Sequence, residues 1–161
     1  MKKVPIIQYL QNIQVDEIKR LCQPLRDYLG ISSFVYRKNY FDGTEINLSN
    51  QPQWVEHFYT QKDLIKNSVF DKHPDHYTSG FVLWSQLEGH QEILSRAKSF
   101  HIDHGITVVK KVHDGIELFY FGTCDNNPSI VNNYLNNLDL LERFILYFKS
   151  QAAGIIKKAE Q

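Results

Sequence analysis

The feature that most restricts the fold of this chain is the stretch from residue 105 to residue 124, which reads GITVVKKVHDGIELFYFGTC. It contains two runs rich in β-branched and aromatic residues, 106–112 and 116–123, and such runs are typical of β-strands. His113, Asp114 and Gly115 separate them. An Asp-Gly step between two such runs predicts a tight antiparallel hairpin, in which the glycine adopts a positive φ.

The alternation of side chains along a strand predicts how this hairpin is buried. In the second run, Leu118 and Tyr120 belong to one face, whereas Phe119 and Phe121 belong to the other. A strand that is apolar on both faces is covered on both. We therefore expect the hairpin to form the centre of a sheet, with helices on one side and more protein, or a ligand, on the other.

The segments before the hairpin predict further helices and strands. An amphipathic helix begins at Val15, is kinked by Pro24 and ends at Gly30. A second hairpin covers 31–48. A short helix from Pro52 follows, then a weakly periodic segment at 60–79 that we interpret as loop and short helical turns, a strand at 80–84 and a helix at 87–100.

The C-terminal region predicts a long amphipathic helix. After the helix-start signal Asn127-Pro128, apolar residues recur at spacings of three and four from Ile130 to Ile155. Unbroken, a helix of about 30 residues would be roughly 45 Å long, which is more than a small domain needs. Either it breaks at Asn132-Asn133 or Asn136-Asn137, or its far end contacts a second subunit.

Together these elements predict an α/β (α+β) fold. We expect an α-β-α sandwich of the PAS/GAF type, with a central, mainly antiparallel five-stranded sheet and helices on both faces. At 161 residues the chain has the length of one domain, so we interpret residues 1–161 as a single unit.

Composition restricts the classes of function. Eighteen Lys and Arg balance eighteen Asp and Glu, so the chain lacks the basic excess that attracts a protein to nucleic acid. Cys22 and Cys124 are its two cysteines, which fits a reduced, cytoplasmic setting. The N-terminal apolar run is interrupted by Pro5 and two glutamines. We therefore predict neither a signal peptide nor a membrane span.

Four short motifs stand in an order that is typical of one protein family. They are Tyr28-Leu29-Gly30 before the first strand, PQWVEHF at 52–58, FVLWS at 81–85 and AKSFHIDHGIT at 97–107. With these motifs the stretch from about Leu21 to Cys124 resembles the N-terminal autoinducer-binding domain of LuxR-type quorum-sensing transcription regulators. In that family a Trp-x-x-x-aromatic helix, a later Trp after an apolar strand and a junction ending in Gly-Ile/Leu-Thr follow one another.

The resemblance implies a small-molecule-sensing regulatory domain and not an enzyme. Trp54 would donate its indole N–H to a ligand carbonyl, Phe58 would line the acyl part of the pocket and Trp84 would contact the headgroup. The ligand-binding residues that we predict are Tyr36, Asn50, Trp54, Phe58, Asn67, Trp84, Tyr120 and Gly122. The resemblance further implies a homodimer through the C-terminal helix and DNA contact only through another domain, since no helix-turn-helix pattern occurs in residues 1–161.

Three departures from the family pattern change the expected ligand. The family has an aspartate followed by proline where this chain has Asn67 and Ser68, and often a tyrosine where it has Asn50. Asparagine brings no charge, and a charge-assisted hydrogen bond is about twice as strong as a neutral one. The hairpin is also bulky, at 119–121, where the family tends to have small residues. We therefore expect a ligand other than a standard acyl-homoserine lactone, or a pocket filled by its own aromatic rings.

Other readings of the sequence remain open. A ligand-free protein-interaction module, which dimerises through the apolar stripe of residues 130–155, is the main alternative. The His-x-x-His pairs at 73–76 and 101–104 have a spacing that could ligate a metal, but such residues are usually solvated or cap a helix, so we predict no metal site and no cofactor. An enzyme that uses these histidines is a third hypothesis.

Overall fold

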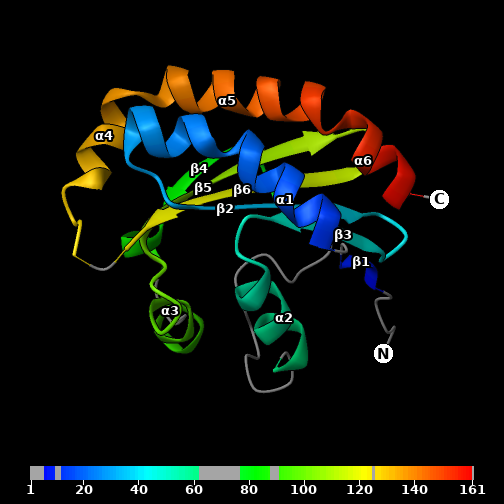
Figure 1. Cartoon of the computed structure of the whole chain (residues 1–161), viewed down its shortest axis with the longest axis horizontal. Helices are drawn as coiled ribbons and strands as arrows, with labels where there is room; N and C mark the ends of the chain where they lie inside the picture. Colours follow the sequence, from blue (N-terminus) through cyan, green and yellow to red (C-terminus); the bar gives the residue numbers. More distant parts are fainter. Residues whose placement is uncertain (1–5, 10–11, 62–76, 88–90, 125, 161) are drawn as a thin grey trace.

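The chain folds into three layers with a sheet in the middle (Figure 1). The computed structural model describes residues 6–9, 12–61, 77–87, 91–124 and 126–160. Its helices are α1 (Asn12–Leu21), the π-helical turn η1 (Leu25–Leu29), α2 (Pro52–Thr60), the 3-10 turn η3 (Trp84–Gln86), α3 (Gln91–Lys98), α4 (Ile130–Asn136), α5 (Leu138–Gln151) and α6 (Ala153–Ala159). Helices α1, α4, α5 and α6 lie on one face of the sheet, and α2 and α3 lie on the other. The predicted α-β-α sandwich is therefore confirmed.

The sheet has the strand order β1-β3-β2-β6-β5-β4. Its strands are β1 (Ile6–Tyr9), β2 (Ser33–Tyr40), β3 (Glu45–Ser49), β4 (Gly80–Leu83), β5 (Asp103–Val112) and β6 (Gly115–Thr123). From β3 to β4 every neighbouring pair is antiparallel, which confirms the five predicted strands. β1 adds a sixth strand parallel to β3. This strand was not predicted, because its four residues are too few to show an alternation of side chains.

The central hairpin forms as predicted, but its glycine has another role than expected. Val112 pairs with Gly115, so His113 and Asp114 make a two-residue loop between β5 and β6. None of these loop residues has a positive φ, so that expectation was wrong. A Cβ on Gly115 would instead lie 2.0 Å from the carbonyl oxygen of Asn39 on β2. Glycine is required here because two strands approach closely, and not because the turn needs a left-handed residue.

The main hydrophobic core lies between the sheet and the layer of α1, α4, α5 and α6. Phe34 and Tyr36 of β2 point into it together with Phe119 of β6. Phe148 of α5 is fully buried there, with its ring centroid 4.8 Å from that of Phe34 and 5.5 Å from that of Tyr36. Burial of this many rings gives the core the largest share of the hydrophobic stabilisation.

The C-terminal helix breaks at one of the predicted asparagine steps. Helix α4 ends at Asn136 and α5 begins at Leu138. The side-chain Nδ2 of Asn137, between them, donates to the backbone carbonyl oxygen of Asn133 over 2.9 Å. A second break at Ala152 separates α5 from α6. The apolar stripe of 130–155 faces the sheet of its own chain. The stripe is thus not available to a second subunit, and any partner would meet the opposite side of these helices.

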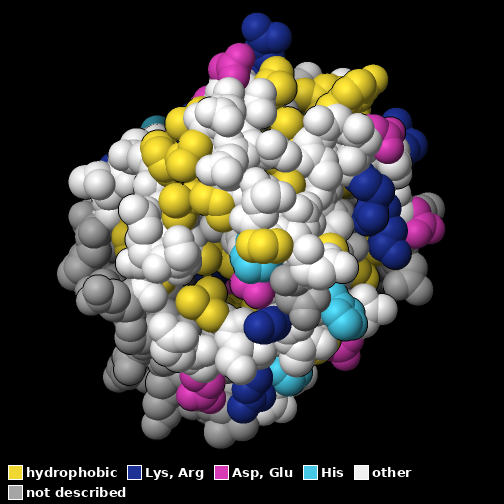
Figure 2. Space-filling model, turned by 90° about the vertical axis from the view of Figure 1, so that its left-hand side faces the viewer, with side chains coloured by type: hydrophobic (Ala, Val, Ile, Leu, Met, Phe, Trp, Pro, Cys, Tyr) yellow, Lys and Arg dark blue, Asp and Glu magenta, His cyan; other side chains and the backbone are white. Residues whose placement is uncertain are grey.

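Charged side chains are dispersed over the end of the molecule that Figure 2 displays. Lys and Arg side chains lie beside Asp and Glu side chains on this face. This distribution agrees with the balanced composition of the chain. Within the described segments, every helix is too short or too polar to cross a lipid bilayer.

Candidate functional site

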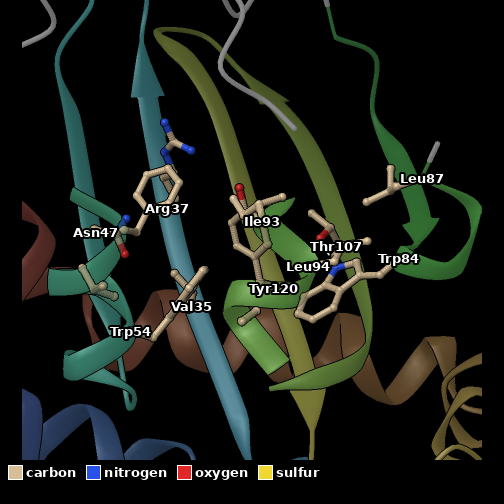
Figure 3. A pocket seen from close by; sticks show the side chains of 13 residues that line it. Val35, Arg37, Asn47, Trp54, Trp84, Leu87, Ile93, Leu94, Thr107 and Tyr120 are labelled. Atoms are coloured by element: carbon tan, nitrogen blue, oxygen red, sulfur yellow. Dashed lines mark hydrogen bonds between the residues drawn. The ribbon is translucent and has the colours of Figure 1, made fainter. Parts of the chain in front are cut away.

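A cavity of about 90 Å³ lies on the face of the sheet that is opposite to the main core. The sheet contributes its floor, and α2, α3 and the η3 turn contribute its walls (Figure 3). Its lining is mainly apolar and comprises Val35, Arg37, Asn47, Trp54, Val55, Phe58, Trp84, Leu87, Ile93, Leu94, Ala97, Thr107 and Tyr120. These residues come from seven separate elements and one connecting residue, so the cavity exists only in the folded chain.

Helix α2 supplies an aromatic wall because Trp54 and Phe58 are four residues apart and share one side of the helix. Their ring centroids are 6.2 Å apart. Trp54 also meets the ring of Phe100, which follows α3, with 5.6 Å between centroids in an edge-on arrangement. His57 contacts the same ring at 5.0 Å. This cluster joins α2 to the end of α3 and closes one side of the cavity.

Trp84 forms the wall at the β5 end, and two features of β5 hold it there. Its indole N–H donates to Oγ1 of Thr107 over 2.9 Å. Its ring lies directly on Gly105, where an added Cβ would be 2.3 Å from the ring atoms Cδ2 and Cε2. The Gly105-Ile106-Thr107 motif therefore positions Trp84: glycine leaves room for the ring, and threonine accepts its hydrogen bond.

The two indole groups of the cavity differ in what they offer a ligand. The N–H of Trp84 is already used by Thr107. Trp54 makes ring contacts with His57, Phe58 and Phe100, but among the described residues none accepts a hydrogen bond from its N–H. An indole N–H is a donor only, so Trp54 is the indole that can still bind an acceptor atom.

Four of the predicted ligand-binding residues lie together in the cavity, namely Trp54, Phe58, Trp84 and Tyr120. Gly122 lies at its edge, since a Cβ there would be 3.3 Å from Cη2 of Trp84. Asn67 lies outside the described residues, as do His73, Asp75 and His76. The remaining two predicted residues, Tyr36 and Asn50, lie elsewhere.

Tyr36 belongs to the opposite face of the sheet. It is fully buried in the helical core, where its hydroxyl donates to Oε2 of Glu117 over 2.7 Å. Lys149 of α5 donates to the other carboxylate oxygen over 2.8 Å. Burial, together with the negative charge of Glu117, raises the pKa of Tyr36 above its ordinary value. Tyr36 therefore does not line the cavity, because alternation along β2 puts Tyr36 and the cavity residue Val35 on different faces.

Asn50 holds the ends of two strands together and does not line the cavity. Its Oδ1 accepts the backbone N–H of Phe34 over 2.9 Å, and its Nδ2 donates to the carbonyl oxygen of Ser32 over 3.2 Å. Both hydrogen-bonding ends of the amide are therefore engaged at the point where β3 passes into α2.

Several cavity residues were not predicted. Val35, Arg37 and Asn47 project from β2 and β3 onto the same face as Tyr120, and β-pairing sets Val35 opposite Tyr120. Strand alternation together with the pairing of β2 and β6 would have identified this face. Arg37 and Asn47 gave no signal of their own, because a polar residue on a strand is more often exposed.

The second histidine pair ends a helix. His101 and His104 both have positive φ, at 62° and 51°, where α3 passes into β5. His101 donates its backbone N–H to the carbonyl oxygen of Lys98, and Ile102 donates to that of Ala97. This is a helix C-cap made with a left-handed residue. Among the described residues, no group of three or more His, Cys, Asp or Glu side chains could hold a metal ion.

No family model and no curated protein sequence matches this chain, but solved structures match it in fold. SdiA in complex with octanoyl-rac-glycerol matches with a TM-score of 0.55 and 14% sequence identity, over 84% of this chain and 63% of that chain. Another structure of SdiA, from Escherichia coli, matches with a TM-score of 0.54 and 15% identity, over 84% of this chain and 64% of that one. The N-acylhomoserine-lactone-dependent LuxR-family transcription factor CepR2 from Burkholderia cenocepacia matches with a TM-score of 0.57 and 11% identity, over 88% and 89% of the two chains.

These matches confirm at the level of fold the resemblance that the short motifs indicated. At 11% to 15% identity they carry the fold alone. The chain spans less than two thirds of the SdiA chains that it matches.

Proposed function

We propose that this chain, which has the fold of LuxR-type autoinducer-binding domains, is a small-molecule-sensing regulatory domain whose ligand lies in the cavity against Trp54, Phe58, Trp84 and Tyr120. The observation that carries the proposal is this cavity itself. It lies on one face of the sheet, while the stabilising core lies on the other. A mainly apolar cavity with a few polar groups is the usual form of a ligand site.

The size of the cavity restricts the ligand. About 90 Å³ is below the roughly 300–1,000 Å³ of ordinary ligand pockets. A long acyl chain would therefore need the aromatic wall to move, whereas a compact ligand would need little change. This supports a ligand other than a standard acyl-homoserine lactone.

Helices α2 and α3 would convert binding into a signal. They are joined through Trp54, His57 and Phe100, so a ligand that repositions Trp54 shifts both helices. Homodimerisation, a cytoplasmic location and an output to DNA through a separate domain belong to the same proposal.

Thermal unfolding with a panel of compact metabolites and lactones tests the proposal. A ligand at a hundredfold excess over its Kd adds about 2.7 kcal/mol to the free energy of unfolding. In a chain of this length that raises Tm by about 5–10 °C. A panel in which no compound raises Tm would refute ligand sensing.

A pair of alanine variants assigns such a shift to the cavity. Ala97→Leu adds three carbon atoms to its wall, and Ala153→Leu makes the same change on the exposed side of α6. The ligand-induced shift should disappear in Ala97→Leu and persist in Ala153→Leu. Equal shifts in both variants would mean that the ligand binds outside the cavity.

A second candidate is a protein-interaction module without a ligand. The observation in its favour is the side of α5 that faces away from the sheet, where Leu146 is 70% exposed and Tyr147 is 40% exposed. Sedimentation velocity distinguishes this candidate, because it requires a dimer that Leu146→Glu dissolves. A monomer at high concentration would exclude it.

A further inference from the structure

One end of the cavity is polar although it is buried. Figure 3 shows Arg37 and Asn47 at the β2 and β3 end, and Trp84 and Leu87 at the other end. Arg37 is only 4% exposed and Asn47 only 6%. Burial of polar side chains at this depth is costly unless their hydrogen bonds are satisfied. The hydrogen bonds of this end therefore indicate what a ligand has to supply.

A chain of hydrogen bonds fixes the orientation of Asn47. Tyr59 of α2 donates its hydroxyl proton to Oε1 of Glu45, and Nδ2 of Asn47 donates to the hydroxyl oxygen of Tyr59 over 3.1 Å. Burial, with the nearby charge of Glu45, raises the pKa of Tyr59, so its phenol keeps its proton. Since that single proton goes to Glu45, the phenol oxygen has to accept from Asn47. If the side-chain amide of Asn47 were flipped, its Oδ1 would face the hydroxyl oxygen of Tyr59, and neither atom would have a proton to donate.

This orientation leaves the carbonyl oxygen of Asn47 without a donor among the described residues, on a side chain that lines the cavity. Oδ1 of Asn47 is buried, and no described group donates a hydrogen bond to it. Asn47 is also one of the residues that line the cavity. An acceptor that is removed from water and left without a donor loses free energy, which a donor on a ligand would restore.

Among the described residues, the charge of Arg37 is balanced by that of Glu45. Nη2 of Arg37 lies 3.1 Å from Oε2 of Glu45, and both side chains are almost completely buried. The guanidinium also lies over the ring of Phe58, 5.5 Å from its centroid. Because Glu45 already neutralises Arg37, an ionised ligand would bring an uncompensated charge into a low-dielectric site. The site thus favours an uncharged ligand.

We propose that Oδ1 of Asn47 accepts a hydrogen bond from a hydroxyl or N–H group of an uncharged, otherwise apolar ligand, and that Asn47 thereby determines the specificity of the cavity. This inference rests on the proposed sensing function and names the chemistry of its ligand. The apolar part of the ligand lies against the aliphatic and indole side chains. Its donor points toward β3.

Two small rings of nearly the same shape test the proposal. Pyrrole has an N–H donor and thiophene has none, and both are compact, otherwise apolar rings. Titrations followed by ¹H–¹⁵N NMR give Kd for each ring with the full chain. We expect pyrrole to bind about tenfold more tightly than thiophene, the ratio that corresponds to one satisfied buried acceptor.

Two variants of conserved shape locate the preference. Asn47→Leu removes the acceptor, and the preference for pyrrole should fall to about one. Asn132→Leu makes the same change on the exposed side of α4, away from the cavity, and the preference should remain. These comparisons measure a ratio, so a general loss of affinity in either variant does not affect them.

The possible outcomes separate this inference from the function on which it rests. Equal affinity of the wild-type chain for both rings would overturn the role of Asn47, and would do so without any variant. A preference that survives in Asn47→Leu would overturn it too. In both cases the cavity still binds ligands and the sensing function stands. If neither ring binds to the wild-type chain, the role of Asn47 is refuted as well, and the sensing function is then decided by the thermal-unfolding panel alone.

Discussion

Replacing Gly105 by alanine is expected to displace Trp84 and to destabilise the protein. The new Cβ would lie 2.3 Å from two ring atoms of Trp84 and 2.5 Å from a third. Ordinary contact begins at 3.4 Å, and the ring is too rigid to bend away. Trp84 therefore has to move by about 1 Å, since repulsion rises steeply at shorter distances.

The size of the effect follows from two contributions. Overpacking of a well-packed site costs about 1–3 kcal/mol. Movement of the ring also breaks the 2.9 Å hydrogen bond from Trp84 to Thr107, which contributes about 1 kcal/mol more. We expect Gly105→Ala to lower the free energy of unfolding by about 3 kcal/mol, and Tm by about 6–12 °C.

Urea unfolding followed by circular dichroism measures this loss, and tryptophan emission reports the displacement of Trp84. Gly154→Ala is the matched control. Apart from the backbone of α6 itself, no heavy atom lies within 4 Å of the new Cβ. Because glycine in a helix is less favourable than alanine, Gly154→Ala should stabilise the protein by about 0.5–1 kcal/mol.

The decisive comparison is a double-mutant cycle. In a Trp84→Ala background the ring is gone, and Gly105→Ala should cost less than about 1 kcal/mol. If the substitution costs the same in both backgrounds, contact with the ring is not the reason that this position needs glycine, and the argument is refuted.

Three further predictions concern the rest of the chain. Phe148→Ala should lower the free energy of unfolding by about 3–5 kcal/mol in urea titrations, because the ring is fully buried; a loss below about 1 kcal/mol would contradict the described core. His101→Gly should raise the free energy of unfolding by about 1 kcal/mol, because His101 is exposed and has a φ of 62°, which glycine adopts without strain. An unchanged urea midpoint would count against backbone strain at this position. Although partial burial raises the pKa of Asp114, the hydrogen bond and charge of Lys38 hold it below its ordinary 3.8. The pair of Asp114 and Lys38 therefore stabilises the fold fully above pH 3.8, and this stabilisation is lost as the pH falls through the lowered pKa of Asp114. The difference in the free energy of unfolding between wild type and Asp114→Asn should shrink between about pH 5 and pH 2. A difference that does not change with pH would refute this role of Asp114.

Local patterns were sufficient for most of the fold. The alternation of Leu118 and Phe119 predicted a hairpin that is buried on both faces, and the hairpin occupies the interior of the sheet with helices on both sides. The asparagines at 136–137 predicted the break between α4 and α5. Such signals depend on residues a few positions apart, and those residues are neighbours in any helix or strand.

The same patterns did not tell which face of the sheet holds the cavity. Both faces of β2 are buried, so alternation separated Tyr36 from Val35 without indicating which of the two meets a ligand. The packing of the helices determines which face holds the cavity. The face of Tyr36 is filled by Phe148 and its neighbours, and the face of Val35 is only partly covered by α2 and α3.

The sequence by itself determined most of the helices, the five antiparallel strands, the central hairpin and the aromatic residues of α2. Only the tertiary structure decided the contacts between distant segments, such as Trp84 on Gly105 and Tyr59 between Glu45 and Asn47. The physical reason is that a buried polar group is defined by its partners. Asn47 becomes a candidate ligand contact because a tyrosine from a helix takes one end of its amide, while the other end has no donor among the described residues and the side chain lines the cavity.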